Sequence, residues 1–320
     1  MFKTKVLFFL YLLLSPYLMS DGHIFVYHRF DDNRYPSTNT SLQELRKEFT
    51  FFKTHNYQVV PLMEMVKKVQ AHEKIPDNWV ALTIDDGFKS FYTNGLPLFR
   101  EFNYPFTLFV AVKYTQEHYR DYVSWHELQE IAKYGDVEFH SYEHGHYGQM
   151  SDDAIRSDMD KGLALMKEHL AYEPRLFVYP YGEYDDRVDS ILQTYHFQGI
   201  FNQNMGAVDG ECSNPYDLDR SALVGNAPFK LFLTFQELCG VTFEQPTHYP
   251  KDKTIKKVEI TLQDKTIKTA EIFISNNGWS RVKVNQGKIL WHANKKVKRD
   301  RIKIGVKVGH KIKLMVLSKE

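Results

Sequence analysis

Short apolar runs alternate with longer amphipathic stretches through the first 200 residues of the chain. The apolar runs predict buried strands at 24–26, 59–60, 80–84, 106–112, 137–139 and 176–178. The stretches between them predict helices at 61–71, 91–102, 125–134, 152–170 and 186–195. Repeated alternation of strand and helix is typical of an α/β domain with a parallel sheet, either open or closed into a barrel.

One further helix has a clear beginning. Ser41 and Glu44 have the spacing of a capping box, in which each side chain accepts a hydrogen bond from the other residue's backbone N–H. Leu45, Phe49 and Phe52 then fall on one face at helical spacing. The pattern predicts an amphipathic helix that starts after Ser41.

The pattern changes near residue 250. Residues 256–262 and 302–308 alternate apolar and polar side chains with a period of two, and 276–278 and 285–287 have turn sequences. We therefore expect a small antiparallel β domain, joined to the rest by a linker at 244–250. The predicted organisation is a signal peptide at 1–20, an α/β domain at 21–245 and a basic β-rich accessory domain at 251–320.

The composition is that of an ordinary globular protein, with 43% hydrophobic and 25% charged residues among 320. It argues against a disordered, collagen-like or coiled-coil chain. The net charge of +1 conceals two opposed parts, because residues 251–320 carry 19 Lys and Arg against 6 Asp and Glu, a net charge of +13. The first 250 residues therefore carry a net charge of −12.

The N-terminus has the features of a signal peptide. Lys3 and Lys5 precede the apolar run 6–14, and residues 18–20 offer a cleavage site. The run is much shorter than the ~20 apolar residues of a membrane-spanning helix. We expect export to the periplasm, the cell envelope or the exterior; the alternatives are an uncleaved anchor and a buried N-terminal helix.

The chain has two cysteines, Cys212 and Cys239. This count excludes the disulfide framework that holds many small secreted domains together. In an oxidising compartment the two thiols can form one disulfide, and two free thiols are the alternative.

A pair of neighbouring carboxylates follows the predicted strand at 80–84. Asp85 and Asp86 precede Gly87, which allows the chain to turn sharply. In α/β folds, the loops at the carboxyl ends of strands build functional sites. One carboxylate can hold a metal ion while the other acts as a base, and the alternative is an ordinary turn.

Two histidines, His140 and His144, follow the predicted strand at 137–139. Imidazoles four residues apart can meet one cation if the loop turns helically, and Asp86 would complete a set of two histidines and one carboxylate. The alternative is a pair of exposed loop histidines. His146 lies nearby, but its spacing suits a shared cation less well.

A third motif, Tyr179-Pro180-Tyr181-Gly182, follows the predicted strand at 176–178. A rigid turn of this kind can present a backbone N–H to a developing oxyanion, and the alternative is a plain turn at the end of a strand. Because all three motifs follow apolar strands, we expect them on one rim of the sheet. Together they favour a metal-assisted hydrolase.

The order and spacing of these motifs carry a family resemblance. The motifs are Thr83-Ile84-Asp85-Asp86-Gly87, His140-Ser141-x-x-His144 and Tyr179-Pro180-Tyr181-Gly182. They resemble the polysaccharide deacetylase (NodB-homology) family, carbohydrate esterase family four, over residues 24–224. The segments 26–30 and 177–182 look most like the branch that contains bacterial poly-N-acetylglucosamine deacetylases. The resemblance implies a distorted (β/α) barrel of the polysaccharide deacetylase type, here followed by a small C-terminal antiparallel β domain.

The resemblance also implies roles for individual residues. These are Asp85 as catalytic base; Asp86, His140 and His144 as ligands of one divalent metal ion; and the backbone N–H of Tyr181, after Pro180, as an oxyanion-hole donor. Zinc suits these ligands best, with cobalt, nickel and iron as alternatives. A divalent ion lowers the pKa of bound water towards ~7 and polarises the acetyl carbonyl, as amide hydrolysis requires.

The sequence departs from the family pattern in two respects. Many family members carry an Arg at the position of Val178, so we expect Arg220 or Arg175 to orient Asp85 instead. The family's late Leu-x-His segment, which supplies a general acid, has no clear counterpart, and the general acid stays unassigned. His28 ends the first predicted strand and is a further candidate for the same rim.

The expected function is metal-dependent hydrolysis of N-acetyl groups from an N-acetylglucosamine-containing envelope or extracellular polysaccharide. The alternatives are a deacetylase or deformylase of a lipid-linked amino sugar and a non-catalytic envelope glycan-binding protein. In 251–320, Trp279 and Trp291 suggest a glycan-binding face, and the basic run 295–301 suggests contact with an anionic envelope polymer or membrane surface. A solubilising lysine-rich surface is the alternative, and export disfavours a nucleic-acid partner.

Overall fold

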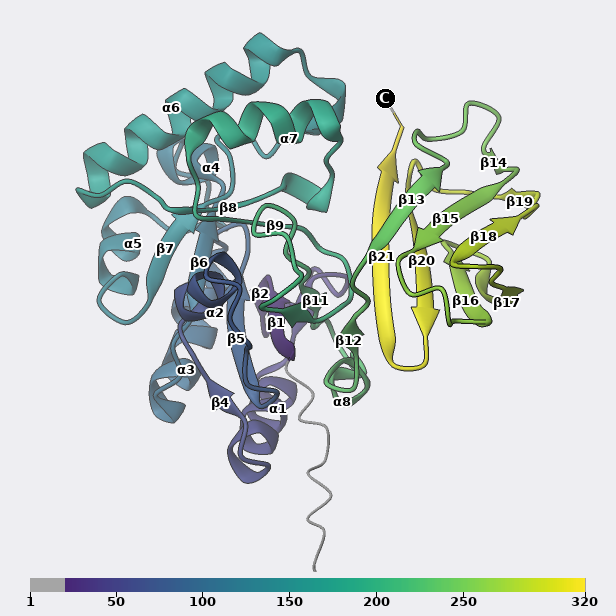
Figure 1. The fold of residues 1–320 in the computed structure, drawn as a ribbon. Coiled ribbons are helices and arrows are strands. Elements are labelled where there is room, and N and C mark those ends of the chain that lie inside the picture. The colour runs from purple at the N-terminus through teal and green to yellow at the C-terminus, as the bar shows by residue number, and fades with distance from the viewer. Residues whose placement is uncertain (1–20, 320) are drawn as a thin grey trace, which may run out of the picture.

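A curved, mainly parallel sheet forms the centre of the first domain in the computed structural model, which describes residues 21–319 (Figure 1). The strands that pair in parallel are β1 (Asp21–Tyr27), β4 (Gln58–Val59), β5 (Trp79–Ile84), β6 (Thr107–Val110), β7 (Asp136–Phe139), β8 (Leu176–Val178) and β9 (Gly199–Phe201). The order across the sheet is β1-β5-β6-β7-β8-β9, and β4 pairs with β5. The strands predicted from apolar runs are confirmed, and β9 is an addition to them.

One segment closes the curved sheet. Residue Leu218 forms a parallel bridge with Phe201 of β9, and β11 (Ser221–Ala222) pairs in parallel with β1. The short strand β10 (Val208–Asp209) pairs with β1 in the antiparallel direction. The segment 217–223 therefore hydrogen-bonds to both edges of the sheet and completes a distorted barrel.

Helices surround the barrel (Figure 1). They are α1 (Leu42–Thr54), α2 (Leu62–Gln70), α3 (Leu96–Phe102), α4 (Val112–Gln116), α5 (Trp125–Ile131), α6 (Asp152–Leu170), α7 (Asp186–Leu192) and α8 (Phe229–Phe232). The predicted capping box is confirmed, because the Ser41 side chain accepts from Glu44 N–H and the Glu44 side chain accepts from Ser41 N–H. Phe49 and Phe52 of α1 are buried in the core as predicted.

The C-terminal part is a mainly antiparallel β domain with a core of its own, in agreement with the predicted fold class. One sheet contains β13 (Val241–Gln245), β15 (Val258–Leu262) and β18 (Lys288–Trp291). The other contains β12 (Gln236–Glu237), β21 (Lys311–Ser318), β20 (Arg301–Val308), β16 (Thr269–Ile274) and β17 (Gly278–Lys283), while β14 (Thr254–Ile255) pairs with β19 (Lys295–Lys296). Among the described strands of this domain, only β12 pairs in parallel, with β21. The predicted linker at 244–250 overlaps the end of β13, which pairs with β15.

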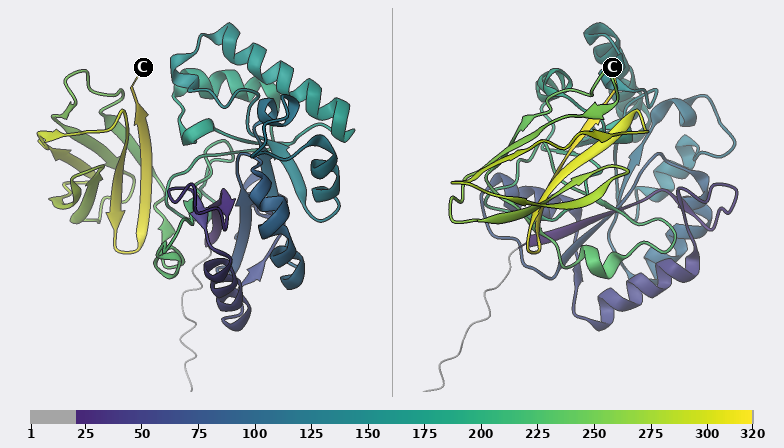
Figure 2. Two further views of the ribbon diagram at one scale, coloured as in Figure 1. Left: turned by 180° about the vertical axis from the view of Figure 1, so that it is seen from behind. Right: turned by 90° about the vertical axis from the view of Figure 1, so that its right-hand side faces the viewer.

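The β domain is attached to the barrel through strand β21. Figure 1 and the left view of Figure 2 place β21 on the side of the β domain that faces the barrel. Ile312 and Leu314 of β21 belong to the core cluster of the barrel domain. Near this junction, Cys212 and Cys239 form a disulfide with a Cα–Cα distance of 5.8 Å, which resolves the alternatives left by the sequence.

The predicted signal peptide at 1–20 lies outside the described residues. Among residues 21–319, no helix is both long enough and apolar enough to cross a membrane. The strands that precede the predicted motifs, β5, β7 and β8, lie within the consecutive run β5-β6-β7-β8 of the sheet. Their carboxyl ends therefore define one rim on which the motif residues can meet.

Candidate active site

Asp86, His140 and His144 meet at the carboxyl rim of the barrel. Asp86 Oδ1 lies 3.3 Å from His140 Nε2 and 3.2 Å from His144 Nε2, and the two Nε2 atoms are 3.1 Å apart. One ligand atom from each residue lies within 4.8 Å of the others. The loops after β5 and β7 thus bring together the three residues that the sequence analysis proposed as metal ligands.

The donor atoms of this trio fit a divalent cation. His140 Nδ1 lies 2.8 Å from the backbone oxygen of Val178, so the proton on Nδ1 is held there and the lone pair of Nε2 faces the other two residues. Asp86 Oδ1 is buried and accepts no hydrogen bond within the described part of the chain. Two imidazoles and one carboxylate with an unsatisfied oxygen are a ligand set that suits zinc and similar metals.

The local backbone shapes this trio. Asp86 and Gly87 have φ values of 73° and 84°, so the chain reverses at the end of β5 and Gly87 adopts a conformation that side chains disfavour. Beyond β7, Ser141 and His144 also have positive φ values of 69° and 56°. The hydroxyl oxygen of Ser141 accepts a hydrogen bond of 2.9 Å from the backbone N–H of His144, which turns that imidazole back towards His140.

Asp85 lies beside the trio but faces a different partner. Arg220 donates from Nη1 to Asp85 Oδ1 and from Nη2 to Asp85 Oδ2, both at 2.8 Å, and both side chains are fully buried. Burial opposes ionisation of Asp85, but the Arg220 guanidinium outweighs it and keeps the pKa of Asp85 below its usual range. A buried but ionised carboxylate next to a potential metal site can accept a proton from water.

Arg220 lies in the segment that closes the barrel, and residues outside that segment fix its guanidinium group. Its Nε donates to the backbone oxygen of Asn202 at 3.0 Å, and its Nη1 also donates to Thr83 Oγ1 at 3.0 Å. Arg175, the other candidate partner of Asp85, lies 4.0 Å from Glu138 instead and is half exposed. The structure therefore places Arg220, and not Arg175, against Asp85.

The family comparison agrees with these motifs. Residues 72–200 match the family model described as polysaccharide deacetylase. This part of the chain is therefore similar to the polysaccharide deacetylase family. The matched stretch includes Asp85, Asp86, His140, His144 and Tyr181, whereas Arg220 and the β domain lie beyond it.

The chain also has distant relatives among curated proteins. The poly-beta-1,6-N-acetyl-D-glucosamine N-deacetylase of Escherichia coli (strain K12) is 24% identical over 252 residues, covering 64% of this chain and 37% of that protein. The chain thus matches little more than a third of the length of this curated relative.

Solved structures share the fold of the deacetylase domain. The structure of IcaB from Ammonifex degensii has a TM-score of 0.57 and 23% identity, covering 64% of this chain and 92% of that chain. The Streptococcus pyogenes deacetylase PplD in complex with acetate has a TM-score of 0.59 and 17% identity, covering 64% and 93%. These similarities confirm the distorted barrel of the polysaccharide deacetylase type.

The third motif of the deacetylase domain borders the trio. Tyr181 has a φ of 59° in the turn that begins at Pro180, and its ring lies 4.5 Å from that of His144. The same ring stacks on His146 at 4.1 Å, and His146 Nδ1 lies 2.7 Å from Glu183. His146 is thus held away from the trio, as its spacing predicted.

His28 and Gln203 complete the rim beside Asp85. Gln203 Nε2 lies 3.4 Å from Asp85 Oδ2 and 3.5 Å from His28 Nε2. Burial lowers the pKa of His28, although the neighbouring Asp86 and Asp85 act in the opposite direction. The lowered pKa favours a neutral imidazole. His28, a candidate from the sequence, therefore lies at the site.

Gln203 was absent from the sequence predictions, because strand β9 was not among the predicted elements. The apolar run 199–201 followed by Asn202 and Gln203 repeats the order of strand and polar residues seen in the other motifs, so a signal was present. No comparable signal marks Lys303 of β20, whose Nζ donates a hydrogen bond to the backbone oxygen of Gln203. Its part in the site depends on how the two domains pack.

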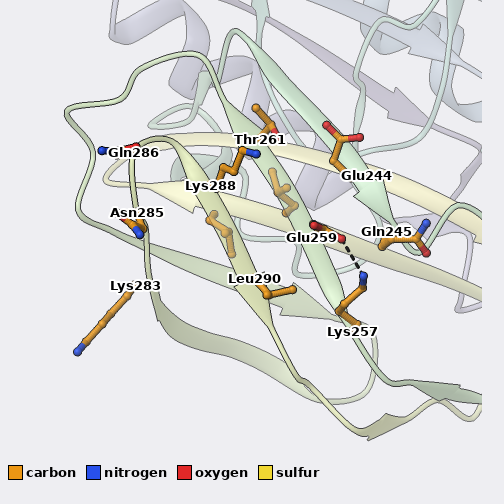
Figure 3. Close-up of a pocket in the computed structure, with 12 residues that line it drawn as sticks. Glu244, Gln245, Lys257, Glu259, Thr261, Lys283, Asn285, Gln286, Lys288 and Leu290 are labelled. Carbon is orange, nitrogen blue, oxygen red and sulfur yellow. Dashed lines mark ion pairs between the residues drawn. The ribbon is translucent and has the colours of Figure 1, made fainter.

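The β domain has a groove of its own, away from the trio. This groove has a volume of about 960 Å³ and lies on the sheet of β13, β15 and β18 (Figure 3). Its lining includes Lys257, Lys283 and Lys288, and Lys257 pairs with Glu259 at 2.8 Å. Trp279 and Trp291 do not line it and belong to different sheets, so the structure does not gather them on one face.

Proposed function

We propose that this protein is a metal-dependent N-deacetylase that hydrolyses N-acetyl groups on an N-acetylglucosamine-containing polysaccharide. The observation that carries the proposal is the trio Asp86, His140 and His144 directly beside the ionised, buried Asp85. A metal site and a proton acceptor within one small rim are what amide hydrolysis by water requires. The deacetylase domain and the activity named for its curated relative point to the same chemistry.

In this proposal, each residue has a distinct task. A divalent cation, zinc by its preference for such ligands, would be held by the trio and would supply an acidified water and a polarised acetyl carbonyl. Asp85 accepts the proton of the attacking water, and Arg220 keeps Asp85 ionised and oriented. The backbone N–H of Tyr181 is assigned to the oxyanion of the tetrahedral intermediate.

Aromatic side chains beside the site support a sugar polymer as the substrate. Phe88 follows Gly87 and packs against Tyr122 with ring centroids 4.8 Å apart. Tyr122 in turn stacks on Tyr114 at 4.3 Å, and Tyr119, at the edge of this group, is 47% exposed. Flat apolar rings with polar hydroxyl groups suit the apolar faces and hydroxyl rim of pyranose rings.

The finer assignments belong to the same proposal. We infer export through the signal peptide at 1–20, and an envelope or extracellular location for the polymer. Lys296, Lys298 and Arg299 are exposed and are candidates for contact with an anionic polymer or membrane surface. A lipid-linked amino-sugar substrate and a non-catalytic glycan-binding role are the competing functions.

The decisive experiment measures acetate release and bound metal on one purified preparation. The substrates are poly-N-acetylglucosamine, chitin oligomers, peptidoglycan and a lipid-linked N-acetylated amino sugar. We expect acetate from a polymer in proportion to bound metal. Acetate from the lipid-linked sugar alone would support the first competing function, with a lipid-linked amino sugar as the substrate in place of a polymer. A metal-loaded protein that retains polymer without releasing acetate would favour the glycan-binding role.

A further inference from the structure

The β domain reaches the rim of the barrel through one lysine. Lys303, the third residue of β20, donates a hydrogen bond from Nζ to the backbone oxygen of Gln203. Lys303 is half buried, and burial lowers its pKa to about 8. Withdrawing an amine from water costs free energy, so the position of the Lys303 amine between the domains requires a compensating interaction. The Gln203 carbonyl supplies that interaction.

Gln203 links this contact to the catalytic base. Its side-chain nitrogen lies 3.4 Å from Asp85 Oδ2 and 3.5 Å from His28 Nε2. Its backbone is enclosed from the opposite side, because a Cβ added to Gly182 would lie 2.8 Å from Gln203 N. Gly182 also has a φ of 63°, so glycine is required there on two counts. Gln203 is therefore held between the third motif and the β domain.

Other contacts between the domains fix the position of Lys303. Lys313 of β21 lies 3.6 Å from Asp219 of the barrel domain and 3.0 Å from Glu237 of the neighbouring strand β12. Asn204 donates from Nδ2 to the backbone oxygen of Leu314 at 3.2 Å. Because β20 and β21 pair along their whole length, these contacts on β21 also set the place of β20. The Lys303 amine is thus delivered by a rigid hairpin and not by a mobile loop.

We propose that Lys303 is a positioning residue for the active site, and that the β domain thereby completes the site. By holding the Gln203 carbonyl, Lys303 keeps the Gln203 amide against Asp85 and His28. The Gln203 amide in turn adds a contact to Asp85 Oδ2 beside the two hydrogen bonds from Arg220, and so helps to hold the Asp85 carboxylate in one orientation. This inference rests on the proposed function for its catalytic consequence, while the position of Gln203 is independent of it.

The test compares two lysines on the same strand of the full-length protein. Lys303→Met keeps the apolar stem but removes the donor, whereas Lys307→Met removes a lysine that pairs with Glu271 at 2.7 Å and lies over Trp279. We expect Lys303→Met to lower kcat by on the order of 10- to 100-fold, since small displacements of catalytic groups have effects of this size. KM, bound metal and Tm should stay near the wild-type values. Lys303→Arg should recover most of the lost kcat, and Lys307→Met should behave like the wild type.

A second readout does not depend on activity. In protein labelled with 15N-glutamine, the side-chain amide signal of Gln203 can be assigned by its absence in Gln203→Glu. We expect this signal to shift and broaden in Lys303→Met and to stay unchanged in Lys307→Met. A wild-type kcat in Lys303→Met, equal losses in both lysine variants, or an unchanged Gln203 signal would overturn the inference. Absence of acetate release from the wild type would reject the proposed function, and the Gln203 signal would still decide on the position of the amide.

Discussion

At the scale of single residues, the neighbouring carboxylates Asp85 and Asp86 differ because of what each one faces. Both oxygens of Asp85 are occupied by Arg220, so Asp85 stays ionised without being free to bind a cation. Asp86 instead presents an unsatisfied oxygen to the two histidines. One residue is thus suited to accept a proton and the other to bind a metal, as the resemblance implied.

This difference predicts separable effects of two substitutions. Asp85→Asn should lower kcat by on the order of 10²- to 10⁴-fold, the usual contribution of a general base, while metal content stays at the wild-type level. His140→Ala should lose the metal because it removes one of three ligands. His146→Ala is the control, since His146 pairs with Glu183 outside the trio and should retain metal. Acetate release and elemental analysis measure both quantities, and equal metal in the Asp85 and His140 variants would refute the assignment.

At the scale of elements, helix α6 approaches strand β7 closely at the point where the metal-site loop begins. Gly162 of α6 is buried, and a Cβ added there would lie 2.5 Å from the ring of Phe139. Phe139 is the last residue of β7, is fully buried, and directly precedes His140. Because residue 162 has no side chain, α6 can pack closely against Phe139. This packing positions the backbone that continues from Phe139 to His140.

Gly162→Ala should consequently weaken both stability and metal binding. Overpacking against Phe139 costs roughly 1–3 kcal/mol. That cost exceeds the gain of up to about 1 kcal/mol from replacing a helical glycine by alanine. Denaturant unfolding and metal titration should therefore show a less stable protein with a higher Kd for the metal. Gly148→Ala is the matched control, because an added Cβ there meets no atom within 4 Å. Wild-type metal affinity in Gly162→Ala would contradict the argument.

The elements also explain how far the sequence could be interpreted. Asp85 and Asp86 follow the strongly apolar strand β5, and His140 and His144 follow the shorter strand β7, so their common rim follows from parallel pairing alone. The sequence could narrow the partner of Asp85 only to Arg220 or Arg175. The approach of Arg220 to Asp85 depends on the segment that closes the barrel. That segment pairs through two short contacts, which are too brief to give a periodic pattern.

At the scale of the whole molecule, part of the basic C-terminal charge faces the acidic barrel. At the junction of the domains, Lys313 lies within 4.0 Å of Asp217 and Asp219 of the barrel and 3.0 Å from Glu237 of β12. The opposed net charges of the two parts therefore serve, in part, to join them. The exposed residues Lys296 and Lys298 of the β domain take no part in this contact. Local sequence patterns predicted both domains but not this contact, since it depends on packing between residues about 100 positions apart.

The same junction predicts a dependence of stability on pH. Burial raises the pKa of Glu237 from 4.5 to about 8, against the opposing effect of Lys313 and together with repulsion from Asp219 and Asp217. Between those pH values the folded protein holds a proton on Glu237 that the unfolded chain releases, so stability falls as the pH rises. Asp21, whose carboxylate accepts from the backbone N–H of Glu237, is the other acid that faces this residue.

Glu237→Gln removes this ionisation but keeps the shape of the side chain. Relative to the wild type, its Tm should therefore fall less between about pH 5 and pH 8, with the difference between the two proteins widening as the pH rises. Thermal unfolding at a series of pH values measures this difference. Glu168→Gln, on the exposed face of α6, is the control and should run parallel to the wild type. If the Glu237 variant also runs parallel, then Glu237 is ionised in the folded protein and the junction is held by a full ion pair with Lys313 at every pH in this range.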